Sequence, residues 1–550
     1  MPLPRLWSFL PARRYQNMKD DNGKKNPGAT AGGRRHFGTR LGNLRAAGAA
    51  WATPSEWLEK ALRAAGRDPA EAAAIMAQLT DVFQAELAVK LAAYDEAKRL
   101  YAPMVRDGRR ELETDLVRLC EQKALVHLTT ADAVGADQEY DQVVAILERL
   151  VEKEGRLDLS NDLASAYLAK SITVRDLGDR KSAVAYCDRA IAIWERQVEQ
   201  GDAESAEDLA RVYWDKAELV CDLGDESAAL ALYERVIAIW EPLVRSDGRR
   251  ELANDLAMAY GEKAEGVGSL GDNRRAVELC DRAIAIQESL VFREGRGDLA
   301  AGLANSYRKK AIALHLLGQH PGSAALYDKA IAILERLVGQ KGRRELAEKL
   351  GEACSEKARL LGFMDDARGA LKMWDKAIAI WEQLVTREGQ RELLSDLATA
   401  YSKKADAMLA LDDNRGAAKL CDKAIAIWER LVDRDGHRER SDELANTYSA
   451  KADVVNLMGD HWGAVALYDR ALDTWEPLRE QGDASLISNI AWAKARRGQT
   501  LIALGEKPKG LGDLRSARDM IQAVAASSGR ADLQERLGRV EEVLAKYLGE

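Results

Sequence analysis

Basic and acidic side chains recur at fixed spacing along this chain, and they are its most regular chemically active groups. A basic side chain returns every 46 or 47 residues, at Lys123, Lys170, Lys216, Lys263, Lys310, Lys357, Lys404, Lys451 and Arg497. An acidic side chain returns with the same period, at Asp95, Asp141, Asp188, Glu234, Asp281, Asp328, Asp375, Asp422 and Asp469. Such groups can form ion pairs with one another, or they can present a charged stripe to a ligand.

We expect each lysine to pair with the acid of its own repeat. If the two helices of a repeat pack antiparallel about the intervening LGD sequence, the lysine of the first helix and the acid of the second lie at the same height along the helix axes. The predicted pairs are Lys263 with Asp281, Lys310 with Asp328, and Lys404 with Asp422. An exposed pair contributes about 0 to 1 kcal/mol, so the pairs are expected to align the helices more than to hold them together. The alternative is a basic stripe that binds an acidic ligand, although nearby Asp and Glu would compete for it.

A tryptophan position follows the same period, as in "CDKAIAIWERLV" at residues 421–432. Its occupants are Leu147, Trp194, Trp240, Gln287, Leu334, Trp381, Trp428 and Trp475. Cys421, Ala424, Ile425, Trp428 and Val432 share one helical face. Because Leu fills the position twice and Gln once, we expect it to pack against the first helix of the next repeat; the alternative is an aromatic ladder for a ligand.

A second acidic position lies near the end of each second helix, at Glu148, Glu195, Glu241, Glu288, Glu335, Glu382, Glu429 and Glu476. We expect these acids to meet the arginines of the following "GRR" loops. A metal site is the alternative, but no His accompanies them.

The cysteines and histidines do not form a catalytic arrangement. Five of the six Cys stand where other repeats carry an aromatic ring, at Cys120, Cys187, Cys280, Cys354 and Cys421, and we interpret them as reduced, apolar fillers. The six His are scattered, and no HExxH, GxSxG or Gly-rich phosphate loop occurs. The sequence therefore predicts binding surfaces, and it predicts no enzyme, cofactor or metal site.

Pairs of helices must position these columns. Residues 248–291 predict one helix from about 251 to 270 and another from about 273 to 291, each with an apolar stripe at helical spacing. A glycine follows each second helix and suits a left-handed residue after the helix end, at Gly108, Gly155, Gly201, Gly248, Gly295, Gly342, Gly389, Gly436, Gly482 and Gly529. One helix pair cannot bury its own stripe, so neighbouring pairs must stack.

Composition narrows the possible partners. Residues 1–50 hold ten Lys and Arg against two Asp, a charge of +8, which leaves −16 for residues 51–550 of a chain with a net charge of −8. An acidic body argues against nucleic acid as the main ligand, except through the basic, Gly-rich tail. No run approaches the roughly 18 apolar residues that span a bilayer, so we expect a cytoplasmic protein without membrane insertion.

The segment "LGDNRRAVELCDRAIAI" resembles the tetratricopeptide repeat, with Gly271, Ala276, Cys280 and Ala283 at the family's turn-glycine, small, aromatic and small positions. The repeat here exceeds the family's usual length of about 34 residues and is similar to the elongated kinesin light chain type. The resemblance implies an all-α, right-handed solenoid of about ten helix pairs. We expect a disordered tail at 1–53, a degenerate helical cap at 54–107, the array at 108–529 and a closing helix at 530–550.

The resemblance also implies that first helices line a concave face on which ligands bind. The inner positions are Ser165, Leu168, Arg211, Trp214, Met258, Glu265, Asn305, Arg308, Ile312, Glu352, Arg359, Thr399, Asp406, Asn446 and Asp453. They vary while their neighbours recur. Arg211, Trp214, Met258, Asn305 and Arg308 form the most suggestive group, because such anchors would suit an apolar peptide carrying an acid.

These observations predict a non-catalytic scaffold or adaptor that binds a protein or peptide, with no small-molecule substrate. The alternative is a sensor or regulatory subunit of a signalling or defence enzyme complex. The Lys and Asn pair with which some members of the family bind a C-terminal carboxylate is absent from the matching positions, so a chaperone-tail receptor is not expected.

Overall fold

The computed structural model describes residues 87–107, 112–202, 204–246, 248–339, 342–480, 486–528 and 531–548. All regular structure within these residues is helical, and they form two compact bodies that divide after Val267. The expected tail at 1–53, the first part of the expected cap, and Gly108, Gly482 and Gly529 lie outside the described residues.

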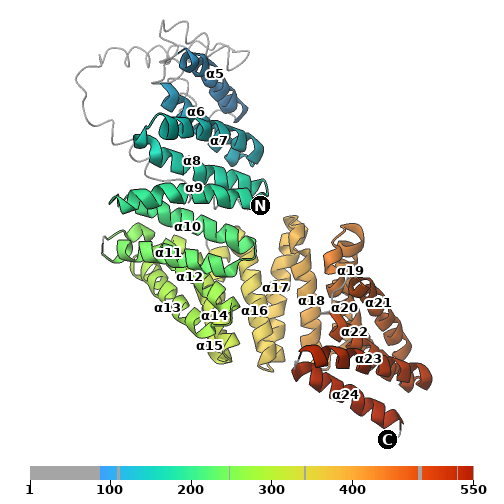
Figure 1. The fold of residues 1–550 in the computed structure, drawn as a ribbon. Helices are drawn as coiled ribbons and strands as arrows, with labels where there is room; N and C mark the ends of the chain where they lie inside the picture. Colours follow the sequence, from blue (N-terminus) through green and yellow to red (C-terminus); the bar gives the residue numbers. More distant parts are fainter. Residues whose placement is uncertain are drawn as a thin grey trace, which may run out of the picture. The chain divides into compact units, whose positions relative to one another are not determined.

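The first body is a stack of helices that lie side by side in chain order (Figure 1). Its helices are α5 (Leu87–Arg106), α6 (Glu113–Thr129), α7 (Ala133–Glu148), α8 (Ser160–Asp176), α9 (Arg180–Glu199), α10 (Ser205–Asp222), α11 (Glu226–Arg245) and α12 (Ala253–Ser269), whose last two residues belong to the second body. α7 continues as a π-helical turn, Arg149–Lys153, and 3-10 turns precede α8 and α12 at Leu157–Leu159 and Arg250–Leu252.

The second body continues the same pattern. It holds α13 (Asn273–Glu288), α14 (Ala300–Leu316), α15 (His320–Gly339), α16 (Ala347–Phe363), α17 (Ala367–Arg387), α18 (Leu394–Leu409), α19 (Asn414–Glu429), α20 (Ser441–Leu457), α21 (His461–Glu480), α22 (Ile487–Ala503), α23 (Lys507–Ser528) and α24 (Ala531–Leu548). One apolar cluster runs from Ile284 to Ala493 through successive helices, and Val540 and Leu544 of α24 join a second cluster with α23. The predicted all-α solenoid is confirmed, and α12 and α13 begin and end within a turn of their predicted bounds.

Short capping motifs close the helix pairs. The Asp225 carboxylate accepts a hydrogen bond of 3.0 Å from the backbone N–H of Ala228 at the start of α11, and the preceding Gly224 has a φ of 86°. Asp365 and Asp412 take the same left-handed turn conformation without glycine, with φ of 57° and 62°. The other glycine column is left-handed at all seven described positions, Gly155, Gly201, Gly248, Gly295, Gly342, Gly389 and Gly436, as predicted.

The tryptophan column is buried at every position. Trp194 and Trp475 are 1% exposed, and Leu147 and Gln287 are covered equally well. Trp194 Nε1 donates a hydrogen bond of 2.6 Å to Asn161 in the first helix of its own repeat, while Gln287 accepts one of 2.7 Å from Ser306 in the next repeat. The column therefore belongs to the core, and covered rings cannot serve as an aromatic ligand ladder. The predicted contact with the next repeat is seen at Gln287, whereas Trp194 and Trp475 donate to the first helix of their own repeat.

The lysine column forms ion pairs, but the predicted partners were wrong. Lys310 Nζ lies 2.5 Å from Asp281 and not beside Asp328, because its side chain points to the second helix of the preceding repeat. The same shift pairs Lys170 with Asp141, Lys216 with Asp188, Lys263 with Glu234, Lys357 with Asp328, Lys404 with Asp375, Lys451 with Asp422, and Arg497 with Asp469. The ladder therefore joins neighbouring repeats.

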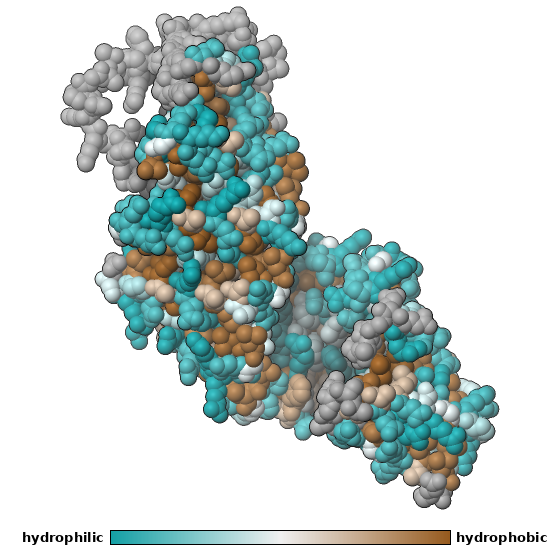
Figure 2. Space-filling view, in the orientation of Figure 1, coloured by the Kyte–Doolittle hydropathy of each residue, from teal (hydrophilic) through white to brown (hydrophobic). Residues whose placement is uncertain are grey.

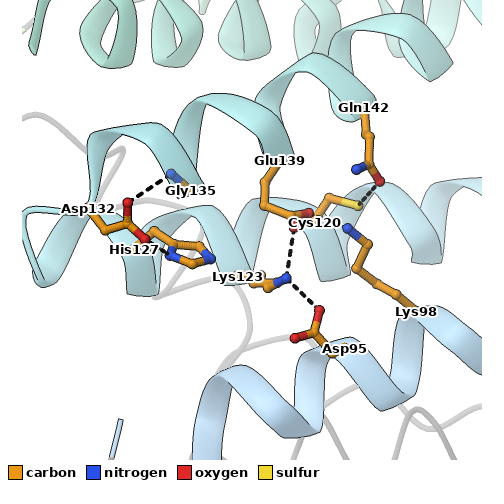
Figure 3. Close-up of polar contacts among 9 residues, drawn as sticks. All are labelled: Asp95, Lys98, Cys120, Lys123, His127, Asp132, Gly135, Glu139 and Gln142. Carbon is orange, nitrogen blue, oxygen red and sulfur yellow. Dashed lines mark hydrogen bonds and ion pairs between the residues drawn. The ribbon is translucent and has the colours of Figure 1, made fainter. Parts of the chain in front are cut away.

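Figure 3 shows an early rung of this ladder, where Lys123 lies between Asp95 and Glu139. Glu139 replaces the Leu that several later repeats carry at this register, and it is 5% exposed. A buried carboxylate is stable only when it is paired, and Glu139 is paired with both Lys123 and Lys98.

The second acidic column also reaches a different partner from the one predicted. Glu429 accepts a hydrogen bond of 2.5 Å from the Tyr448 hydroxyl and lies 2.8 Å from Arg470, whose guanidinium sits 4.3 Å from the Tyr448 ring centroid. Equivalent tyrosines of the next repeat donate to Glu148, Glu195, Glu288 and Glu382. The loop arginine Arg343 instead pairs with Glu345 of its own loop. Tyr and Lys stand three residues apart on one helical face, so both reach the preceding repeat.

Candidate partner-binding surface

The predicted binding residues of the first body are only partly available. Trp214 is 6% exposed, its ring centroid lies 5.5 Å from that of Tyr233 and 6.0 Å from that of Trp240, and it is therefore part of the core. The prediction that it anchors a partner is wrong, because the ring packs back onto α11. Arg211 lies 3.4 Å from Glu207, while Met258 is 37% exposed on α12.

Asp215, which sequence reasoning missed, is a buried carboxyl on α10. It is 7% exposed and makes no hydrogen bond or ion pair with another described residue. Burial raises the pKa of Asp215 to about 7, the Glu218 carboxylate acts in the same direction, and Arg175 and Arg211 oppose them. A single sequence gives no signal for this, since charged residues occupy the same position in other repeats.

The predicted residues of the second body are mostly tied to their neighbours. The Arg308 guanidinium lies 2.6 Å from Glu356, 3.7 Å from Glu352 and 3.2 Å from the Asn305 side-chain oxygen. Asp406 pairs with Lys403 at 3.2 Å. Asp453 accepts hydrogen bonds from Tyr468 and Arg496. These groups are satisfied within the protein, so a partner would have to compete for them.

Ile312 and Arg359 differ from that rule. They share a register that holds acids at Glu218, Glu265, Asp406 and Asp453 and apolar residues at Leu125 and Ile172, so Arg359 of α16 is a basic exception beside the apolar Ile312 of α14. Ile312 is 37% exposed. Arg359 is also exposed and has no ion pair with any residue that the structure describes.

One helical turn further, α14 and α16 carry Leu316 and Phe363, which are 58% and 71% exposed. The same register holds Asp176, Asp222, Ser269 and Ala410 in other repeats and Leu457 in one. These large apolar groups therefore have no counterpart in most of the array. In Figure 2, brown apolar surface interrupts the teal hydrophilic surface in the region of α14 and α15.

His315 completes this surface. Its ring centroid lies 5.0 Å from that of Phe363, and its Nδ1 lies 3.1 Å from Nδ1 of His320, the first residue of α15. Burial, His320 and Arg359 lower the pKa of His315. We define Ile312, His315, Leu316, Arg359 and Phe363 as the α14–α16 patch. Ile312 and Arg359 belong to the predicted inner positions, whereas His315, Leu316 and Phe363 do not. A comparison of the repeats at the register of Phe363 would identify that residue as unusual.

Other chemistry finds little support among the described residues. No group of three or more His, Cys, Asp or Glu side chains within them could hold a metal ion, and none of their helices is long and apolar enough to cross a membrane. The cysteines predicted to be apolar fillers are buried, whereas Cys221 is exposed. Burial raises the pKa of Cys120, Cys187, Cys354 and Cys421 to about 12, so these thiols stay protonated at neutral pH.

Comparison with known protein families gives a match for two stretches of the chain. A sequence profile described as tetratricopeptide repeat matches residues 303–344 and 397–439, which are copies of the recurring repeat. None of the curated proteins is similar enough in sequence to count as a match.

Three solved structures are similar to parts of the chain. BtubC (BKLC) from P. vanneervenii is 20% identical, with a TM-score of 0.37, over 46% of this chain and 93% of that one. A signal-transduction ATPase with a tetratricopeptide repeat sensor, from Pyrococcus horikoshii, is 14% identical, with a TM-score of 0.47, over 76% of this chain and 54% of that one. A tetratricopeptide repeat protein from Parabacteroides merdae is 16% identical, with a TM-score of 0.32, over 57% of this chain and 93% of that one.

Proposed function

Because this chain belongs to the tetratricopeptide repeat family, we propose that it is a non-catalytic scaffold or adaptor whose α14–α16 patch binds a protein or peptide partner. The observation that carries the proposal is the exposure of Phe363 and Leu316 beside the unpaired Arg359. Large apolar groups at this register are not required by the repeat, since Asp, Ser and Ala replace them elsewhere.

The composition of the patch suits an interface. Aromatic residues and arginine supply a large share of the binding energy at protein interfaces, chiefly where surrounding contacts exclude water. Covering Phe363 and Leu316 would remove apolar area from water, at about 25 cal/mol per Å². Arg359 would add a charged hydrogen bond without first breaking an ion pair within the described part of the chain.

Affinity capture from the native lysate with matched variants tests the proposal. Phe363→Asp adds a charge inside the patch, and Leu157→Asp adds the same charge at a position of the first body that is 72% exposed. We expect one or more captured proteins, identified by mass spectrometry, to be lost with Phe363→Asp and retained with Leu157→Asp. Equal recovery with both variants, when both have the circular dichroism of the parent chain, would contradict the proposed binding surface.

A further inference from the structure

We infer that the partner segment at the α14–α16 patch is an apolar peptide with one or two acidic side chains, its carboxylate on Arg359 and its apolar side chains against Ile312, Leu316 and Phe363. This inference rests on the proposed function and names the chemistry of the partner. It further predicts that binding tightens when His315 takes up a proton.

The charges on the first helices support an acidic partner at this place. Arg211, Arg308, Lys403 and Arg496 each lie within 3.4 Å of a carboxylate of the protein. Arg359 has no such neighbour among the described residues. It acts electrostatically on His315 and on Glu356, and the Glu356 carboxylate is already paired with Arg308. A carboxylate from a partner would complete the arrangement that the other basic groups already have.

The net charge of the chain limits how acidic the partner can be. Residues 51–550 carry a formal charge of −16, which repels a strongly acidic segment at long range. At physiological salt, exposed charges further apart than about 8 Å are largely screened. One or two carboxylates can therefore be bound locally by Arg359, whereas a run of many acids would be repelled.

The spacing of the patch sets the spacing of the partner's side chains. Arg359 and Phe363 are four residues apart on α16, as are Ile312 and Leu316 on α14, so each pair lies on one helical face about 5 to 6 Å apart. The contact of the Phe363 ring with His315 brings the two pairs together. The partner must therefore present its acid within a few residues of a large apolar side chain.

The two imidazoles make the charge of the patch dependent on pH. His315 lies in the last turn of α14, where the helix dipole favours a cation, and His320 begins α15, where the dipole disfavours one. The two Nδ1 atoms, 3.1 Å apart, can share one proton, which places a positive charge on the pair of rings beside Arg359. The groups that face His315 are His320 of α15 together with Arg359 and Phe363 of α16.

The low pKa of His315 delays this charge until the pH falls below the ordinary histidine value of about 6.5. The added positive charge lies beside Arg359 and attracts the carboxylate of the partner. By linkage, the bound carboxylate favours protonation of His315, so a proton is taken up on binding below neutral pH.

Selection from a random library of displayed twelve-residue peptides tests the chemistry of the partner. The full chain is the bait, and the Arg359→Glu/Phe363→Asp variant is used to remove peptides that bind elsewhere. We expect enriched peptides to carry Asp or Glu within four residues of Leu, Ile, Phe or Trp. Enrichment of neutral or basic peptides that still require Phe363 would overturn the acidic assignment and leave the proposed function standing.

The remaining outcomes are also decisive. If no peptide is enriched while capture from lysate still depends on Phe363, the partner is a folded surface and the peptide inference is wrong. If capture from lysate is indifferent to Phe363 as well, the proposed function fails with it.

Fluorescence anisotropy with a labelled, enriched peptide then tests the role of His315. We expect Kd to fall about threefold to tenfold between pH 7.5 and pH 5.5, since His315 is half-buried and the exposed Arg359 lies in water, which weakens the attraction between charges. His315→Asn should abolish that change. His461→Asn should preserve it, because His461 pairs with Asn456 in the same body. A pH dependence that survives His315→Asn would refute the histidine step.

Discussion

Replacing the buried carboxyl of Asp215 should remove a pH dependence from the stability of the first body. The carboxyl of Asp215 has no hydrogen-bonding partner among the described residues, and burial raises its pKa from 3.8 to about 7. The folded chain therefore holds a proton that the unfolded chain releases between about pH 4 and pH 7. This group thus supports the fold at low pH, and its contribution is lost as the pH rises through 7.

The magnitude follows from the shift. Three pKa units correspond to about 4 kcal/mol, and relaxation around an ionised carboxyl makes this an upper limit. Asp215→Asn cannot ionise, so we expect it to be more stable than the parent chain at pH 8.5 by about 2 to 4 kcal/mol and to differ much less at pH 5. The matched amide substitution Glu204→Gln, at an exposed carboxylate of the same body, should leave the pH dependence unchanged.

Hydrogen exchange followed by mass spectrometry reads this effect locally, because the chain has two bodies that need not unfold together. Peptides from α8 and α10 should exchange more slowly in Asp215→Asn than in the parent chain at pH 8.5, after correction for the intrinsic exchange rate. The same protection factors in both proteins at pH 8.5 would refute the assignment of a buried, destabilising carboxylate.

Three further predictions concern the ladder, the caps and the thiols. A double-mutant cycle should give a coupling of about 0.5 kcal/mol between Lys404 and Asp375 and none between Lys404 and Asp422; the reverse result would restore the pairing expected from sequence. Gly389→Ala should lower the free energy of unfolding by about 1 to 2 kcal/mol, measured by urea titration, because its φ is 72°, and an unchanged midpoint would contradict this. A thiol reagent should label Cys221 first in the folded chain, and prompt labelling of all the cysteines would show that the burial is wrong.

The fold was predictable because its signals repeat. Two columns with one period fixed the helix pairs, and the left-handed glycines and the buried tryptophan column followed from the same register. The partners of the charged columns could not be predicted from sequence, because the height of a residue along its helix does not show which neighbouring helix its side chain faces. Lys310 could face its own second helix or the preceding one, and Tyr307, three residues earlier, faces the same way because both lie on the surface that meets α13.

The binding surface was predictable only in part. The inner register included Ile312 and Arg359, but it also included Trp214, which the ring cluster with Tyr233 and Trp240 buries. Variation between the repeats shows that the fold does not require one residue type at a position. It does not show whether the side chain there is buried or already bonded to another residue of the protein. Asp453 and Arg359 occupy the same variable position of their repeats. Asp453 is nevertheless bound by Tyr468 and Arg496, whereas Arg359 has no ion pair with a described residue.

Site-specific photo-crosslinking can show whether a partner contacts the α14–α16 patch. Benzoylphenylalanine is placed at Phe363 in the full chain, with the same residue at Leu157 of the first body as the control, and both proteins are irradiated in native cells. We predict that Phe363 forms a discrete crosslinked product that is lost when Arg359→Glu is added, and that Leu157 does not form it. The same products from both positions, or a Phe363 product that is unaffected by Arg359→Glu, would show that the α14–α16 patch is not the binding surface.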